Sequence, residues 1–184
     1  MADPHTHTDD DLIAMLQTDS DKAIDLIFRQ YHKICHISAI RIVKDKHVAE
    51  DIVQDVFLEL WKKRGRYVIN TALKAYLRRS VVNRSLNYIR DLKIVFDEED
   101  KIPNTSVREE GALKGLETEE LGIKINEAIN RLPERCRIVF TLSRFEEMTY
   151  QQIADQLNIS IKTVENQISK ALKQLRIAIK PYLE

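Results

Sequence analysis

The stretch MTYQQIADQLNISIKTVENQISKAL, residues 148–172, has the spacing of two helices joined by a sharp corner. Thr149 and Gln152 fit a capping box, in which the hydroxyl accepts from a backbone amide and the glutamine side chain bonds back to the cap. Asn158 favours the left-handed conformation that ends a helix, and Ser160 is a good cap for a second helix. The chain is therefore predicted to turn sharply between Asn158 and Ser160.

The two sides of this corner differ in polarity. Ala154 is small enough for the helices to approach closely, and apolar residues recur on the inside, which is the pattern of a helix-turn-helix. Amide side chains can read adenine edges and ammonium groups can contact phosphates or guanine. The outer face of the second helix carries this mixture in Lys162, Thr163, Asn166, Gln167, Lys170 and Lys173. Duplex DNA recognition is predicted, against the alternative of a helical hairpin with an ordinary solvated face.

The composition is that of a helical globular protein with balanced charge. Hydrophobic residues make up 43% and charged residues 32% of the 184 residues, with four glycines and four prolines, so long helices and little sheet are expected. No apolar run approaches the length of a membrane span, and the N-terminus lacks the basic and apolar blocks of a signal peptide, which predicts a cytoplasmic protein.

No motif predicts catalysis, a cofactor or a metal. The chain contains no nucleophile elbow, P-loop or glycine-rich phosphate loop, so it is not expected to be an enzyme. His32, Cys35 and His36 share a helix face, but without a fourth ligand in view such groups more often pack than bind metal. The two cysteines lie in different apolar segments, and no disulfide framework is expected.

The zero net charge conceals segregated charge. Residues 47–64 are predicted to form a helix with Val48, Ile52, Val56 and Leu60 on one stripe and acidic residues on another. Residues 71–93 form a second predicted helix that is basic, and residues 94–115 are acidic, contain proline and glycine and show no sustained period. Two helical domains are therefore predicted, at 9–94 and 118–184, with a linker at 95–117.

Several motifs together resemble a known family. LPERCRIVFTLSRFEEMTYQQIADQLNISIKTVENQISKALKQLR, residues 132–176, is similar to the C-terminal domain of sigma-70-type sigma factors of the extracytoplasmic-function (ECF) group, which reads the promoter element near minus 35. The helix-turn-helix of two-component response regulators shares much of this framework. The C-terminal half alone leaves both families open.

The N-terminal half resembles the sigma factors specifically. AEDIVQDVFLELWKKR, residues 49–64, is similar to the region that binds the clamp helices of the RNA polymerase beta-prime subunit, and AYLRRSVVNRSLNYIRDLK, residues 75–93, to the region that melts and reads the minus 10 element. The resemblance covers about residues 10–180. It implies an all-α fold, with a sigma region 2 helical bundle joined by a flexible acidic linker to a sigma region 4 helix-turn-helix.

The resemblance also implies contacts for particular residues. Those expected to meet core polymerase are Glu50, Asp51, Gln54, Asp55, Leu58 and Trp61. Alternatively, Trp61 belongs to the core of its own domain and the acids are only solvated. Those expected at the opened minus 10 DNA are Asn83, at a flipped base, Tyr67, as the pocket wall, and Arg79, Arg84, Asn87 and Arg90. Alternatively, this basic helix is only solvated or pairs with the acidic linker.

Three positions depart from the pattern of the family. Tyr76 replaces a common tryptophan, and Glu147 and Asn158 stand where glycine is common. The implied function is a transcription initiation factor whose partners are core RNA polymerase, promoter DNA and an anti-sigma factor, with no insertion into a membrane. The alternatives are a dimeric helix-turn-helix regulator that binds duplex operators without polymerase, and a helical adaptor with no role at DNA.

Overall fold

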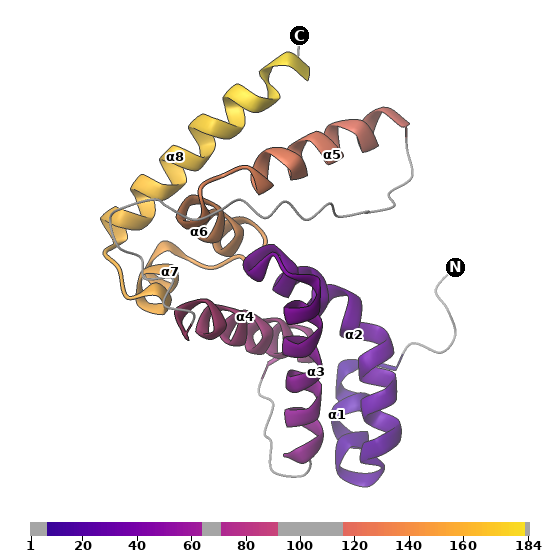
Figure 1. Ribbon diagram of the computed structural model, residues 1–184. Helices are drawn as coiled ribbons and strands as arrows, with labels where there is room; N and C mark the ends of the chain where they lie inside the picture. Colours follow the sequence, from indigo (N-terminus) through magenta and orange to yellow (C-terminus); the bar gives the residue numbers. More distant parts are fainter. Residues whose placement is uncertain (1–6, 64–70, 92–115, 183–184) are drawn as a thin grey trace. The chain divides into compact units, whose positions relative to one another are not determined.

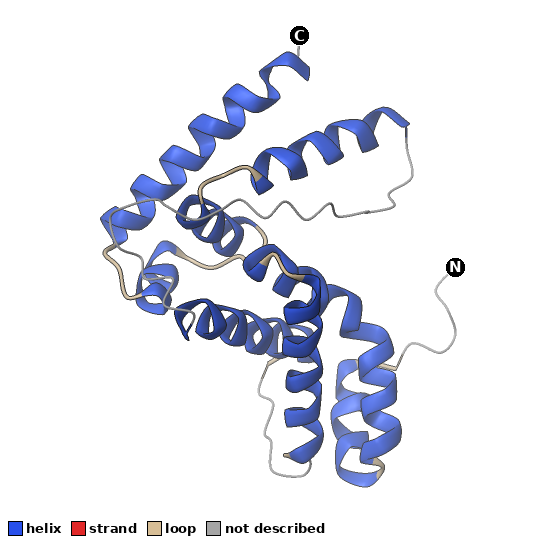
Figure 2. Cartoon of the chain, viewed as in Figure 1, coloured by secondary structure: helices blue, strands red, loops and turns tan. Residues whose placement is uncertain are grey.

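The computed structural model describes residues 7–63, 71–91 and 116–182, with side chains from residue 122 onward in the last range. These residues form eight α-helices and one short 3₁₀ helix, and no strand occurs among them (Figures 1 and 2). The predicted all-α fold is confirmed. The chain divides into two compact units, Met1–Ile94 and Val95–Glu184. The predicted linker, 95–117, lies almost wholly outside the described residues.

Among its described residues, the N-terminal unit has four helices: α1 (Asp9–Thr18), α2 (Ser20–Val43), α3 (Lys46–Lys62) and α4 (Leu73–Asp91). The long α2 packs against each of the other three, and α3 also packs against α4 (Figure 1). The core of this unit is therefore built around α2.

Local sequence signals set where these helices begin. The side chain of Thr8 accepts from the amide of Asp11, whose carboxylate accepts from the Thr8 amide, so α1 opens with a capping box. Asp19 caps α2 and Asp45 caps α3, each by accepting backbone amide bonds from the first helical turn. Each of these three helices therefore begins at a side chain that caps it.

The apolar stripe predicted for α3 faces the core of the N-terminal unit. On α3, Ile52, Val56 and Leu60 are buried and Val48 is half-buried, whereas Asp51 and Asp55 of the acidic stripe are exposed. The fully buried large side chains of this unit come from all four helices and comprise Leu12, Ile27, Ile42, Val53, Leu60, Leu73, Leu77 and Val81. Each helix thus contributes one apolar face, and the charged residues stay at the surface.

The C-terminal unit contains α5 (Leu116–Asn130), α6 (Glu134–Arg144), α7 (Tyr150–Leu157), α8 (Ile161–Ile179) and the 3₁₀ helix η1 (Lys180–Tyr182). Helix α8 packs against α5, α6 and α7. Its buried side chains are Val164, Ile168, Ala171 and Leu175, which recur at helical spacing and define its inner face.

The predicted corner lies between α7 and α8. Thr149 Oγ1 accepts from the Gln152 amide at 3.2 Å, and Gln152 Oε1 accepts from the Thr149 amide at 2.9 Å. Asn158 ends α7 with φ 53° and ψ 48°, and Ser160 Oγ accepts from the Thr163 amide at 3.0 Å to begin α8. The capping box, the left-handed cap and the second N-cap are all confirmed.

Two of the three departures from the family pattern have left-handed backbone. Glu147 has φ 56° and Asn158 has φ 53°, so glycine is common at these positions because it adopts this conformation without steric cost. Asparagine tolerates it better than most residues, because its short side chain bonds locally.

Replacing Asn158 by valine should destabilise the C-terminal unit by about 1–2 kcal/mol, because a β-branched residue strains a left-handed backbone. Asn158→Gly should stay within a few tenths of a kcal/mol of the wild type. The single tryptophan, Trp61, lies in the N-terminal unit, so its fluorescence does not report on the C-terminal unit. Urea unfolding of the C-terminal unit is therefore measured by circular dichroism, as the transition that is absent from the tryptophan fluorescence. Asn166→Val, at an exposed position inside α8, is the control, and an equal loss in both valine variants would contradict the backbone argument.

Candidate polymerase and DNA interfaces

The residues predicted to meet polymerase lie along α3, and together we call them the α3 surface: Glu50, Asp51, Gln54, Asp55, Leu58 and Trp61. Their spacing places them on adjoining turns of one side of the helix. Asp51, Gln54 and Asp55 are exposed, and Leu58 leaves 44% of its surface exposed, which is unusual for so large an apolar side chain in this unit. The α3 surface therefore combines exposed carboxylates with an apolar anchor.

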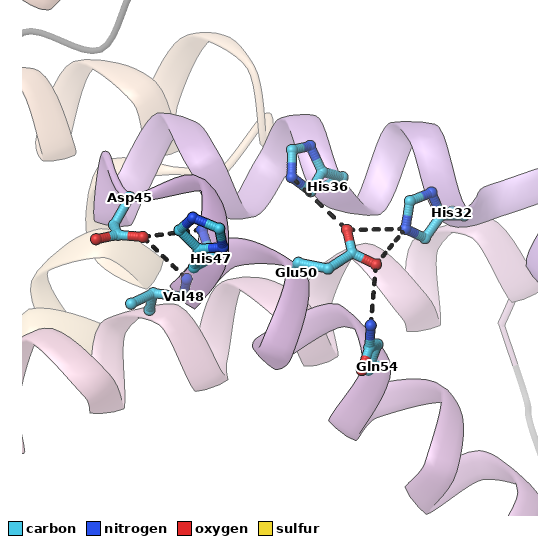
Figure 3. Close-up of polar contacts among 7 residues, drawn as sticks. All are labelled: His32, His36, Asp45, His47, Val48, Glu50 and Gln54. Atoms are coloured by element: carbon cyan, nitrogen blue, oxygen red, sulfur yellow. Dashed lines mark hydrogen bonds and ion pairs between the residues drawn. The ribbon is translucent and has the colours of Figure 1, made fainter.

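Glu50 forms the polar junction between this surface and α2 (Figure 3). Its carboxylate oxygens lie 3.1 and 3.2 Å from His32 Nε2, and one of them lies 3.8 Å from His36 Nε2. Gln54 Nε2 donates to it at 3.2 Å. Burial alone would raise the pKa of Glu50, but the hydrogen bonds with His32 and Gln54 outweigh burial and lower it. Glu50 is thus held within the unit as an anion.

Both histidines, His32 and His36, have a partner in this junction. Both are half-buried on α2, and Cys35 between them is fully buried in the core. Within the described ranges, no group of three or more histidine, cysteine, aspartate or glutamate side chains has the geometry to hold a metal ion. In the structure His32 packs against Phe28, the two histidine rings stack on each other, and both histidines pair with Glu50.

A hydrogen bond connects Trp61 to its own unit. Its indole Nε1 donates to Asp21 Oδ1, at the start of α2, at 2.7 Å, and its side chain is half-buried. Trp61 therefore belongs in part to its own unit, and its contact with polymerase stays a prediction.

The residues predicted to meet the minus 10 DNA lie on α4, except Tyr67, which lies outside the described residues. Arg79, Asn83, Asn87 and Arg90 are spaced by four, four and three residues, so they form one stripe on α4, which we call the α4 stripe. Arg79, Asn87 and Arg90 are exposed and Asn83 is half-buried. Arg90 pairs at 3.7 Å with its neighbour Asp91.

Arg84 points to α3 instead. Its guanidinium donates to Asp55 Oδ2 at 3.2 Å and to Glu59 Oε2 at 2.5 Å. Hydrogen bonds from Lys63 and then Arg84 lower the pKa of Glu59. The acidic partners of this basic residue are therefore on α3 of its own unit.

Arg84→Ala should destabilise the N-terminal unit at neutral pH by about 0.5–1 kcal/mol, because it removes a half-exposed pair of ionic bonds. Glu59 has a folded pKa below its ordinary value of 4.5, so its contribution is present above that value and is lost as the pH falls through the folded pKa. The difference between variant and wild type should therefore shrink towards acid. Urea unfolding followed by Trp61 fluorescence measures it. Arg79→Ala on the same helix is the control, and a difference that does not depend on pH would contradict this account.

Fewer of the residues predicted on the outer face of α8 are exposed than the sequence suggests. Lys162, Asn166, Lys170 and Lys173 are exposed, and Lys162 pairs at 3.1 Å with Glu165. Thr163 and Gln167, the other two predicted contacts with the minus 35 element, are half-buried.

Gln167 uses its amide oxygen inside the unit. Cys136 Sγ on α6 donates to Gln167 Oε1 at 2.9 Å. Gln167 lies three residues after the buried Val164 and four before the buried Ala171, so it borders the inner face of α8. Helical periodicity alone did not distinguish a residue at the edge of the inner face from a residue on the outer face of α8.

None of the helices in the described part of the chain is both long enough and apolar enough to span a membrane.

Comparisons with protein families match both units. Residues 27–94 match the model described as Sigma-70 region 2, and residues 123–175 match Sigma-70, region 4. Together these matches cover well over half of the chain, in the order predicted from the sequence.

Individual relatives match along nearly the whole chain. It is 27% identical to the RNA polymerase sigma-H factor of Pseudomonas aeruginosa, over 95% of each chain. It is 26% identical to the ECF RNA polymerase sigma-E factor of Escherichia coli K12, over 96% of each chain.

Two solved structures share the fold. One is the sigma factor RpoE in complex with the anti-sigma factor NepR from Bartonella quintana, with 22% identity, a TM-score of 0.50 and coverage of 89% of this chain and 98% of that one. The other is CnrH in complex with the cytosolic domain of CnrY, with 20% identity, a TM-score of 0.52 and coverage of 94% of this chain and 97% of that one.

With both regions matched in one chain, the response-regulator alternative is not favoured, and the chain belongs to the sigma-70 family of RNA polymerase sigma factors, in its extracytoplasmic-function group.

Proposed function

We propose that this chain directs RNA polymerase to specific promoters as an ECF sigma factor, docking through region 2 at 9–94, opening the minus 10 DNA with the same region, and gripping the minus 35 duplex through region 4 at 118–184. The observation that carries the proposal is the presence of both region matches, in order, in one chain. The segment 95–117 is the proposed linker between the two activities.

The α3 surface is the proposed contact with the clamp helices of the beta-prime subunit. Exposed carboxylates at Asp51 and Asp55 steer a basic partner, and Leu58 and the exposed part of Trp61 give apolar anchors. Glu50 pairs with His32 on α2 and accepts from Gln54, so its carboxylate is a fixed group rather than a mobile one.

The α4 stripe is the proposed contact with the opened minus 10 DNA. A base that leaves the stack needs a pocket that reads its edge, and the half-buried amide of Asn83 suits that task. The exposed Arg79, Asn87 and Arg90 suit backbone phosphates or neighbouring bases, and Tyr67 is the proposed pocket wall. Arg84 is a candidate only when its bonds to Asp55 and Glu59 are exchanged for DNA.

The outer face of α8 is the proposed contact with the minus 35 major groove. Lys162, Asn166, Lys170 and Lys173 are exposed there, with Thr163 and Gln167 at its edge. Lysines supply phosphate contacts and Asn166 an amide for a base edge.

Further partners follow from the relatives. RpoE and CnrH were solved with an anti-sigma factor and with CnrY, respectively, and we propose that this chain is also held by an anti-sigma factor. The chain would act in the cytoplasm, where core polymerase is, and would have no enzymatic activity or cofactor of its own.

Binding to DNA with and without core polymerase tests the proposal. A sigma factor should bind promoter duplexes weakly alone and tightly with core enzyme, whereas a dimeric regulator binds palindromic operators tightly without polymerase. Fluorescence anisotropy with labelled promoter fragments measures this, and tight binding that core polymerase does not change would contradict the proposal.

A further inference from the structure

Asp9, the first residue of α1, joins three helices of the N-terminal unit. Its Oδ2 accepts from the backbone amide of Leu73, the first residue of α4, at 2.9 Å. Its Oδ1 accepts from the hydroxyl of Tyr31 on α2. The match to the region 2 family model begins only at residue 27, so Asp9 lies outside it.

The residue at the N-terminus of α4, Ala72, has no side chain that could cap the helix. The amide of Tyr76 donates to the carbonyl of Ala72 at 3.1 Å, which makes Ala72 the N-cap residue. Alanine is a poor N-cap because it has no side-chain oxygen to accept from the first amides of the helix. The Asp9 carboxylate supplies the missing acceptor, and its negative charge is favourable at a helix N-terminus.

The two hydrogen bonds of Asp9, to Leu73 and to Tyr31, form what we call the joint, and buried side chains surround it. Leu73 and Leu12 are fully buried, and Tyr31 is 7% exposed. Burial, followed by the hydrogen bond to Asp9, raises the pKa of Tyr31 to about 12, so the phenol stays a proton donor at any working pH. The capping box of Thr8 and Asp11 fixes the turn of α1 on which Asp9 lies.

We propose that Asp9 is a positioning residue for promoter opening, because it caps α4 from another helix and holds the start of the helix that carries the α4 stripe. The inference rests on the proposed function of α4. Arg79 follows Leu73 by six residues, less than two turns, so a start that frays loosens the beginning of the stripe.

Three variants of the full chain test this. Asp9→Ala removes the acceptor, Asp9→Asn keeps an amide oxygen in its place, and Asp10→Ala removes the same charge from an exposed neighbour in the same turn. For each, NMR measures hydrogen exchange at the Leu73 amide, and fluorescence of a base analogue measures opening of a promoter obtained by run-off selection, at saturating core polymerase. Affinity for core polymerase is measured separately.

Asp9→Ala should speed hydrogen exchange at the Leu73 amide. It should also lower promoter opening about fivefold, the ratio that corresponds to the ~1 kcal/mol typical of a lost N-cap, with affinity for core polymerase unchanged. Asp9→Asn should lie nearer the wild type, and Asp10→Ala should match it. Unchanged exchange at Leu73 would overturn the cap, and faster exchange with unchanged opening would overturn the positioning role. If Asp9→Ala does not fold, Asp9→Asn and Tyr31→Phe decide, because each weakens one bond of the joint. A wild type that opens no promoter would refute the proposed function, while exchange at Leu73 would still decide the cap.

Discussion

Asp55→Lys is expected to weaken binding to core RNA polymerase by about tenfold or more, mainly through slower association. Asp55 lies on the α3 surface with 62% of its side chain exposed, and reversing its charge replaces attraction with repulsion towards a basic partner. The effect should shrink at high salt, because exposed charges are screened. Association and dissociation rates on immobilised core polymerase, at two salt concentrations, measure it.

Asp25→Lys is a matched control for this change. Asp25 is also an exposed carboxylate on a helix, with 56% of its side chain exposed, and it is paired with an arginine, Arg29, at 3.0 Å. It lies on α2, outside the α3 surface. Equal weakening by both variants would mean that net charge, rather than the α3 surface, governs docking. Neither variant should change affinity for a minus 35 duplex.

Asn83→Ala is expected to reduce promoter opening about tenfold or more while leaving binding to the minus 35 duplex unchanged. A base-edge contact by an amide is worth about 1–3 kcal/mol, and alanine leaves the edge of the flipped base without it. Opening is measured with a fluorescent base analogue in the minus 10 element, and duplex binding by anisotropy.

The matched control is Asn126→Ala, the same change at an exposed position of α5 in the C-terminal unit. It should leave both measurements as in the wild type. Equal loss of opening and of minus 35 binding in Asn83→Ala would mean that Asn83 acts on the fold or on general affinity, and its place at the flipped base would be wrong.

The corner between α7 and α8 could be predicted closely because its determinants are local. Thr149, Asn158 and Ser160 each bond within a few residues of themselves, so the sequence contains both partners of every bond. The buried face of α3 followed from periodicity for the same reason, since helical spacing alone sets which residues share a side.

Contacts between distant residues could not be predicted in this way. Arg84 meets Asp55 across 29 positions, Trp61 meets Asp21 across 40, and Asp9 meets Leu73 across 64. Which of several charged neighbours a long side chain selects depends on how the helices cross, and that is a property of packing. Gln167 shows the same limit, because helical spacing placed it near the edge of a face without showing that Cys136 donates to it.

These contacts also refine the proposed sites. The α3 surface includes residues already held by the unit itself, Glu50 and Trp61, beside more exposed ones, Asp51 and Leu58. Held side chains lose less conformational entropy on binding than mobile ones. The region 2 unit therefore presents a partly preorganised surface to its proposed partner.

The most direct test of the central claim is run-off transcription by core RNA polymerase, with and without the chain, on a library of genomic fragments. Transcripts should begin at defined promoters only when the full chain is added, and they should be reduced with Asn83→Ala and with Asp55→Lys. No promoter-dependent transcript from any fragment, together with tight binding of the chain alone to palindromic duplexes, would contradict it.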